Sequence, residues 1–284
     1  MKLQGKTIVI TGASSGIGRA MALRAAQDKC TVVIAARNID KLSEVKEEIE
    51  KLGSTAIAVE CDVTKDDDIR NLFLKATEGG RVLDVVFNNA GLGYINPLED
   101  LKLEEIHKMI DVNTTGMIIS TKFATEVMVR QKHGHIIMTS SIAGLLSLPQ
   151  WTVYCATKWA ITGFAAGLRP ELKKYNIKIT TLHPGTVATS FFDKDKANFD
   201  INLAGNPKDI ITPEQVAEAV YDAIFTNKKK IIIPAFAKNY ALFYKYLPDL
   251  VETQLVKIAG EIEYHKDIEE DEPEFDYIKE VKAD

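Results

Sequence analysis

The 284-residue chain is poor in cysteine and has no long apolar run. Its three cysteines, Cys30, Cys61 and Cys155, are too few for a disulfide framework, and none has the CxxC spacing of zinc or dithiol redox sites. No apolar segment is long enough to span a membrane, and a charged N-terminal hexamer runs directly into the apolar residues 7–10, which leaves no room for a signal peptide. We therefore expect a soluble protein of a reducing, cytoplasmic compartment.

Most of the chain also has little net charge. The 35 basic and 40 acidic residues give a net charge of −5, but residues 266–284 contain nine acids and three lysines. The preceding 265 residues are therefore near +1, too little for the basic surface that nucleic-acid-binding proteins use. We expect no nucleic-acid partner, and we predict that residues 266–284 form a solvated, flexible tail. The five histidines are scattered, with only His133 and His135 close together, so we predict no metal site.

The composition, 46% hydrophobic and 26% charged, is that of a globular protein. Short runs rich in β-branched residues alternate with longer amphipathic segments such as residues 38–52, a pattern that predicts βα units. The sequence therefore predicts an α/β fold, a doubly wound, Rossmann-type sheet of seven parallel strands with helices on both faces. The predicted strands are residues 7–11, 31–36, 55–60, 83–88, 135–140, 178–183 and 230–234.

A glycine-rich loop follows the first predicted strand and precedes a helical run at residues 19–27. Glycines in such a loop let the backbone approach a pyrophosphate, and the helix that follows directs its N–H groups and its positive end toward it. The loop matches neither GxGxxG nor GxxxxGK[ST], and a plain turn between strand and helix is the alternative. The candidate cofactor-binding residues here are Gly12, Ser14, Ser15, Gly16, Ile17 and Gly18.

The ends of the next two strands carry residues that could select the cofactor. The second strand ends at Arg37 with no carboxylate to bind a ribose 2′-hydroxyl, and a guanidinium suits a 2′-phosphate. This favours NADP(H), with NAD(H) possible, although Arg37 could also be an ordinary surface residue. Asp62 and Val63 follow the third strand, where Asp62 could accept a hydrogen bond from adenine or cap a helix that starts near Lys65.

Tyr154 and Lys158 are four residues apart at the start of a predicted helix, which places them on one helix face. A phenol titrates near pH 10, and an adjacent cation stabilises the phenolate and lowers its pKa toward the neutral range. The pair therefore suits proton transfer, although a Tyr-x-x-x-Lys spacing also occurs by chance on helix surfaces.

Taken together, these motifs closely resemble the short-chain dehydrogenase/reductase family between Gly5 and Pro234. They occur in the family's order, each at the end of a predicted strand. The motifs are TGxxxGxG at residues 11–18, NNAG at residues 88–91, Ser141 thirteen residues before Tyr154, Lys158, and Pro184–Gly185 after the next strand.

The resemblance implies a role for each matching residue. Tyr154 would exchange a proton with the substrate oxygen, Lys158 would lower its pKa and hold the nicotinamide ribose, and Ser141, rather than the neighbouring Ser140, would bind the carbonyl. Asn113 would fix a water that links Lys158 to solvent. The residues that would line the cofactor channel or hold the carboxamide are Asn89, Ala90, Gly91, Pro184, Gly185, Val187 and Thr189.

Two residues of the predicted helix 151–175 need separate interpretation. Cys155 follows the tyrosine but points about 100° away from it on a helix, so we expect small-residue packing rather than a nucleophile. Pro170 removes a backbone hydrogen bond and is expected to kink the helix. In the family this helix often pairs with its twin in another subunit, so the resemblance implies a homodimer or homotetramer whose geometry Pro170 leaves open.

Residues 235–265 form an aromatic extension beyond the last predicted strand, with apolar residues at helical spacing around Pro248. They could pack as helices on the sheet or on a second subunit, cap a lipophilic pocket together with Phe191 and Phe192, or touch a membrane surface, a contact that the acidic tail makes unfavourable. The long irregular stretch 191–211 is typical of an active-site lid. We predict one dinucleotide-binding catalytic domain over residues 1–265.

The leading functional hypothesis is an NADP(H)-dependent oxidoreductase that reduces a ketone or aldehyde to an alcohol, or catalyses the reverse reaction, on a small lipophilic substrate. One alternative is a reductase of 3-oxoacyl thioesters in fatty-acid metabolism. The other is a non-catalytic NADP(H)-sensing protein that keeps the fold.

Overall fold

The computed structural model describes residues 2–189, 191 and 210–260. The predicted tail 266–284 and most of the predicted lid 191–211, including Phe192, lie outside the described residues. Seven parallel strands form one sheet in the order β3-β2-β1-β4-β5-β6-β7, which confirms the predicted fold class. The strands are β1 Thr7–Thr11, β2 Thr31–Ala36, β3 Thr55–Glu60, β4 Val85–Asn88, β5 Gly134–Thr139, β6 Ile177–Pro184 and β7 Lys230–Ile233.

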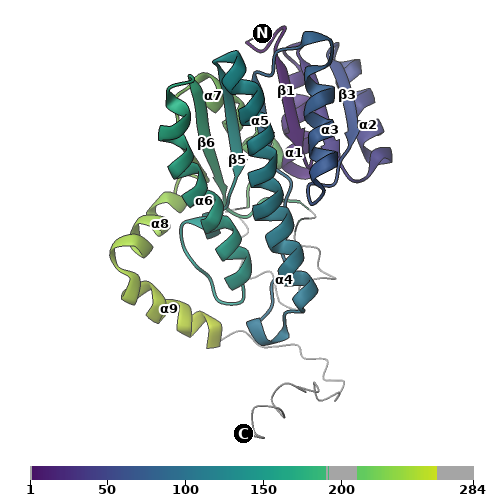
Figure 1. Cartoon of the computed structure of the whole chain (residues 1–284). Helices are drawn as coiled ribbons and strands as arrows, with labels where there is room; N and C mark the ends of the chain where they lie inside the picture. The colour runs from purple at the N-terminus through teal and green to yellow at the C-terminus, as the bar shows by residue number, and fades with distance from the viewer. Residues whose placement is uncertain (1, 190, 192–209, 261–284) are drawn as a thin grey trace, which may run out of the picture.

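Helices cover both faces of the sheet (Figure 1). One buried apolar cluster joins the sheet to α1, α2 and α7, and the other joins it to α3, α5 and α6. The helices before β7 are α1 Gly16–Ala26, α2 Ile39–Lys51, α3 Asp66–Thr77, α4 Leu103–Ile110, α5 Met117–Gln131, α6 Thr152–Lys173 and α7 Pro213–Phe225. Beyond β7, α8 Ala237–Tyr246 and α9 Pro248–Gly260 project from the body as an arm (Figure 1).

Local sequence signals account for several helix starts. Asn38 caps α2 by accepting a hydrogen bond from Lys41 N at 2.9 Å. Thr212 and Gln215 form a capping box at the start of α7, with Pro213 in its first turn. None of the described helices combines the length and apolarity that crossing a bilayer requires.

Two elements start at least two residues away from their expected positions. Helix α1 begins at Gly16 rather than at residue 19, and the extended residue that precedes it is Ser15. Strand β4 begins at Val85 rather than at Leu83, whose N–H donates to the Gln131 side chain instead of to the sheet.

Helix α6 runs through Pro170 to Lys173 as one element. Pro170 lies in the last turn, so it removes a partner only from the carbonyl of Ala166, a residue that solvent can reach. Pro170 therefore does not end the helix that carries Tyr154 and Lys158.

The strand order reverses between β1, which continues to β2, and β4, which continues to β5. In a doubly wound sheet this switch point opens a crevice at the carboxyl ends of the strands, where ligands bind. The predicted motifs all follow strands, so the fold brings them to this edge.

Candidate active site

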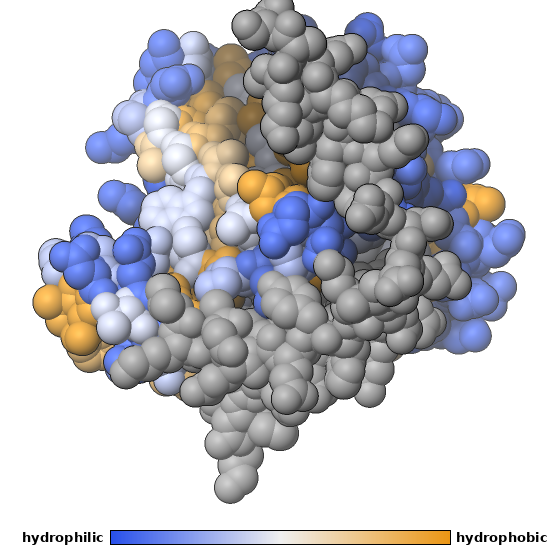
Figure 2. Space-filling view, turned by 90° about the horizontal axis from the view of Figure 1, so that it is seen from below, coloured by the Kyte–Doolittle hydropathy of each residue, from blue (hydrophilic) through white to orange (hydrophobic). Residues whose placement is uncertain are grey.

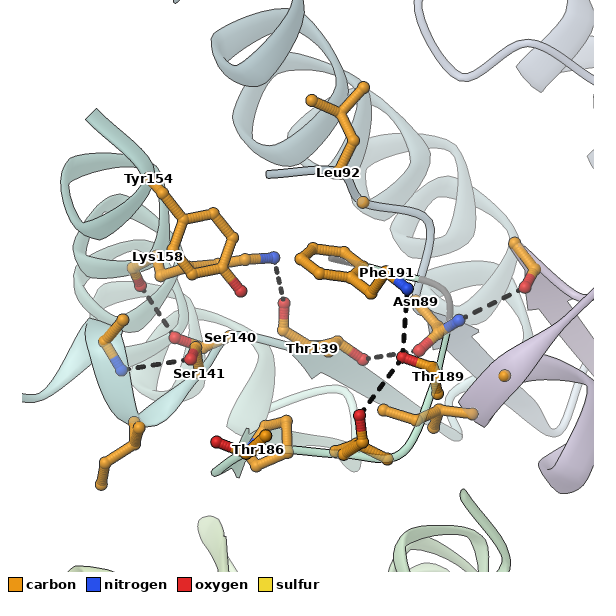
Figure 3. Close-up of a pocket in the computed structure, with 18 of the residues that line it drawn as sticks. Asn89, Leu92, Thr139, Ser140, Ser141, Tyr154, Lys158, Thr186, Thr189 and Phe191 are labelled. Atoms are coloured by element: carbon orange, nitrogen blue, oxygen red, sulfur yellow. Dashed lines mark hydrogen bonds between the residues drawn. The ribbon is translucent and has the colours of Figure 1, made fainter. Parts of the chain in front are cut away.

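A cavity of about 1030 Å³ lies at the carboxyl edge of the sheet. Residues that follow each of the seven strands line it together with residues of α6, α8 and α9. Figure 3 shows the part of the cavity around Tyr154 and Lys158. Of the predicted cofactor-binding residues, those that line it are Gly12, Ser14, Ser15, Gly16, Ile17, Arg37, Asp62, Val63, Asn89, Ala90, Gly91, Lys158, Pro184, Gly185, Val187 and Thr189. Ser141 and Tyr154 line it too, whereas Gly18 and Asn113 do not.

Two positions of the glycine loop have no room for a Cβ. Gly12 has a φ of +66°, and a Cβ there would lie 2.9 Å from the Cα of Ala90. A Cβ on Gly18 would lie 2.2 Å from the carbonyl oxygen of Gly12, so this residue lets α1 pack against the loop rather than line the cavity. The loop thus leaves open the space over the start of α1 in which a pyrophosphate fits.

The side chains beyond β2 and β3 form the far end of the cavity. Arg37 is exposed and lines it, and so do Asn38 and Lys41, which the sequence reasoning missed. Lys41 could have been found from its position in the first turn of α2, directly after the strand end that carries Arg37. The two cations of this end are therefore Arg37 and Lys41.

Asp62 does not cap a helix. Its carboxylate accepts hydrogen bonds from the N–H of Thr64 at 3.0 Å and from its hydroxyl at 2.8 Å, and α3 starts after Lys65 without a side-chain cap. Burial alone would raise the pKa of Asp62, but the hydrogen bonds from Thr64 and the charges of Arg37 and Lys65 lower it. The capping alternative is wrong, and an ionised Asp62 faces the cavity.

The loop after β4 is tied to its neighbours on both sides. The backbone N–H groups of Asn89 and Ala90 donate to the hydroxyl of Thr11 at 3.0 and 3.1 Å, and the hydroxyl of Thr139 donates to Asn89 at 3.3 Å. A Cβ on Gly91 would lie 3.4 Å from the Lys158 Nζ. The loop therefore reaches from the glycine loop to the predicted catalytic residues.

Tyr154 and Lys158 lie together on α6, and both are buried. The Lys158 Nζ is 5.4 Å from the centre of the Tyr154 ring and donates to the carbonyl of Thr139 at 3.3 Å (Figure 3). Burial lowers the pKa of Lys158 to about 8.

The expected fall of the tyrosine pKa is not seen. Burial raises the pKa of Tyr154, and a hydrogen bond with Ser141 offsets only part of this rise. The reason is desolvation, which disfavours the phenolate of Tyr154 as it disfavours the ammonium of Lys158. The structure thus holds the phenol in its protonated form, ready to donate.

Two adjacent serines have different surroundings. The Ser140 hydroxyl donates to the carbonyl of Lys158 at 2.9 Å and so ties the end of β5 to α6. The Ser141 hydroxyl accepts from the N–H of Ala143 at 3.1 Å and lies beside Tyr154 in the cavity (Figure 3). The geometry agrees with the preference for Ser141 as the substrate-binding serine, a role that stays a prediction.

His183 supports Ser141 from behind and was missed as a site residue. It is fully buried, and its Nδ1 lies 2.9 Å from the Ser141 carbonyl, to which it donates because a carbonyl only accepts. Its Nε2 lies 2.9 Å from the Thr181 hydroxyl. A polar residue at the buried end of a strand, directly before Pro184, was the available sequence signal.

Asn113 lies in a π-helical turn, Asp111–Gly116, between α4 and α5. Its amide exchanges two hydrogen bonds of 2.8 Å with the backbone of Leu92 and donates to the Thr157 hydroxyl at 3.2 Å. It therefore fixes the loop after β4 against α6. The predicted contact with a water remains a prediction.

Aromatic rings enclose Tyr154 on the substrate side. The rings of Trp151 and Phe191 meet it edge to face at centroid distances of 5.8 and 6.0 Å, and both line the cavity. Cys155 is buried away from the cavity, and burial raises its pKa, so the packing interpretation is confirmed. No group of three or more metal-ligating side chains occurs in the described ranges.

The comparisons with known proteins agree with this geometry. A family model described as short chain dehydrogenase matches residues 6–199. An uncharacterized oxidoreductase of Listeria monocytogenes is 37% identical over 228 residues, which are 79% of this chain and 92% of the relative. The 3-ketodihydrosphingosine reductase of Bos taurus is 30% identical over 235 residues, which are 80% of this chain and 71% of that protein.

Among solved structures, an alcohol dehydrogenase from the archaeon Thermococcus sibiricus, complexed with 5-hydroxy-NADP, matches with a TM-score of 0.72 at 30% identity. The match covers 81% of this chain and 96% of the other. The chain belongs to the short-chain dehydrogenase family and is an oxidoreductase that acts on CH–OH groups with a nicotinamide dinucleotide as cofactor.

Proposed function

We propose that the enzyme uses NADPH to reduce a ketone or an aldehyde to the alcohol, and that Ser141, Tyr154 and Lys158 carry out the proton chemistry. The observation that carries the proposal is the convergence of these three side chains on the cavity that the glycine loop also lines. The Bos taurus relative is named for the reduction of a ketone, which supports a carbonyl substrate.

The preference for NADP(H) rests on Arg37 and Lys41. Both line the cavity beyond β2, where a carboxylate would select the unphosphorylated ribose. Two cations and no carboxylate at this strand end favour a 2′-phosphate. The archaeal relative's complex with an NADP derivative is consistent with this choice.

NADPH, when bound in this cavity, would supply a hydride for the carbonyl carbon. The Tyr154 hydroxyl donates its proton to the carbonyl oxygen, so one hydride and one proton convert the carbonyl into the alcohol. Ser141 donates a hydrogen bond to the same oxygen and holds it beside Tyr154. Lys158, with its cation over the ring, stabilises the phenolate that remains, and burial of the site strengthens this attraction.

The test is NADPH oxidation, followed by absorbance, with a panel of diones, aldehydes, quinones and 3-oxoacyl thioesters. We expect turnover of at least one simple ketone or aldehyde. Turnover of the thioesters alone would replace the proposal with the 3-oxoacyl alternative. Measurable NADPH binding with no turnover of any compound would favour the sensing alternative.

We also propose that two copies pair through α6. Its exposed face carries small residues at helical spacing, including Ala156, Ala160, Gly163 and Gly167, over which a second helix can approach closely. Gly163→Glu should therefore yield monomers in size-exclusion chromatography. An unchanged elution volume in a variant that still binds NADPH would contradict pairing at this face.

A further inference from the structure

We propose that α8 and α9 bind an unbranched aliphatic chain of the substrate, so that the enzyme acts on a carbonyl carried by a long alkyl group. This inference rests on the proposed function and adds the substrate class. It assigns the aromatic extension a role in substrate binding rather than in packing alone.

The two helices present apolar side chains to the same cavity that contains Tyr154. Phe236, Tyr240 and Phe243 follow one another at helical spacing along one side of α8, and all three line the cavity. Val251 and Leu255, four residues apart on α9, also line it. The cavity is therefore continuous from the predicted proton donor to the arm.

Further apolar side chains line the same cavity. These side chains are Leu92, Ile142, Leu146, Leu148, Trp151 and Phe191. Over the described part of the chain, the charged residues that line the cavity are Arg37, Lys41, Asp62 and Lys158. None of these comes from residues 237–255, because the charged residues there, Lys238, Lys245, Asp249 and Glu252, do not line it. A phosphorylated or carboxylated tail would find no partner along the arm, whereas an alkyl chain would be desolvated there.

The dimensions favour a chain over a compact group. From Phe236 to Phe243 the α8 stripe extends roughly 10 Å at a rise of about 1.5 Å per residue. Tyr240 and Phe243 nevertheless remain 61% and 56% exposed, although they line the cavity. Large apolar side chains left this accessible gain most from a ligand that covers them.

The opposite side of the arm provides matched controls. Leu242 and Leu250 are exposed to similar extents, 42% and 58%, but they do not line the cavity. Figure 2 shows the molecule from below, and apolar side chains are exposed at the left of this view, on the side where Figure 1 places the arm. Substitutions of Leu242 and Leu250 change the apolar character of the arm without changing the cavity wall.

The experiment measures kcat/KM with NADPH for straight-chain aldehydes and methyl ketones of increasing length. We expect kcat/KM to rise roughly fourfold for each added methylene, the fold-change that corresponds to about 0.8 kcal/mol. Phe243→Ala and Val251→Ser should lower kcat/KM for the longest members roughly tenfold more than for the shortest. Leu242→Ala and Leu250→Ser should leave the dependence on length intact.

The outcomes separate the inference from the proposed function. A rate that is independent of chain length, or an equal effect of the cavity and control variants, would overturn the inference while the proposed reduction stands. Failure of every member of the series, long and short, with NADPH bound, would overturn both.

Discussion

The glycine loop offers the sharpest structural perturbation, Gly18→Ala. An alanine Cβ at this position would lie 2.2 Å from the carbonyl oxygen of Gly12, 2.8 Å from its carbonyl carbon and 2.9 Å from the Asn89 Nδ2. Two of these atoms are backbone, so a side-chain rotation cannot relieve the overlap. Either α1 or the loop must move by about 1 Å to restore ordinary contact distances.

The displacement sets the size of the expected effect. Overpacking of a tightly packed site destabilises proteins by about 1–3 kcal/mol. The same shift removes the loop N–H groups from their positions around the pyrophosphate, and we expect NADPH to bind about 10- to 100-fold more weakly, because misplacement of about 1 Å has effects of this order. The loss of affinity should therefore be accompanied by a loss of stability.

The assay combines fluorescence titration with NADPH and urea unfolding of the apoprotein. Gly167→Ala is the control, because nothing in the same chain lies within 4 Å of a Cβ at that position of α6, and the exposed helix face that carries Gly167 already contains Ala156 and Ala160. This variant should bind NADPH as the wild type does and gain about 0.5–1 kcal/mol in stability. Wild-type NADPH affinity and stability in Gly18→Ala would refute the close packing of α1 against the loop.

Two further predictions concern charge. Arg37→Ala should weaken NADPH binding about tenfold and leave NADH binding nearly unaffected. The tenfold loss is the lower end for a charge-assisted hydrogen bond, because Arg37 is exposed. Equal losses in titrations with the two cofactors would show that Arg37 does not contact the 2′-phosphate. Burial lowers the pKa of His135 and of His183 to about 4, so both stay neutral when folded while the unfolded chain takes up protons below pH 6.5. The free energy of unfolding should therefore be highest above pH 6.5 and should fall by about 2 kcal/mol per histidine at pH 5. In urea unfolding, His183→Asn should roughly halve this loss. Identical free energies of unfolding at pH 7 and pH 5 would contradict the prediction.

The sequence was sufficient for the sheet and for most of the candidate site. Strands such as β1 are buried on both faces and so appear as continuous β-branched runs, and the motifs lie at strand ends, which a parallel sheet gathers at one edge. The amphipathic segment 38–52 also matches α2, which spans Ile39–Lys51.

The remaining features depend on contacts between distant segments. The contact of His183 with Ser141 joins residues 42 positions apart, and no local pattern encodes it. The rise of the Tyr154 pKa follows from burial in the folded chain, which outweighs the local effect of a lysine four residues later. The residues of α8 and α9 that reach the cavity are set by the direction in which the arm leaves β7, and periodicity alone could not give that direction.

The central claim is that Tyr154 transfers the proton in a carbonyl reduction. Its most direct test is the rate of carbonyl-dependent NADPH oxidation by Tyr154→Phe, which removes one hydroxyl and keeps the ring between Trp151 and Phe191. The account predicts a fall in kcat of at least about 100-fold, the lower end for general acid catalysis, with NADPH affinity nearly unchanged. A variant that keeps most of the wild-type rate would contradict the assignment.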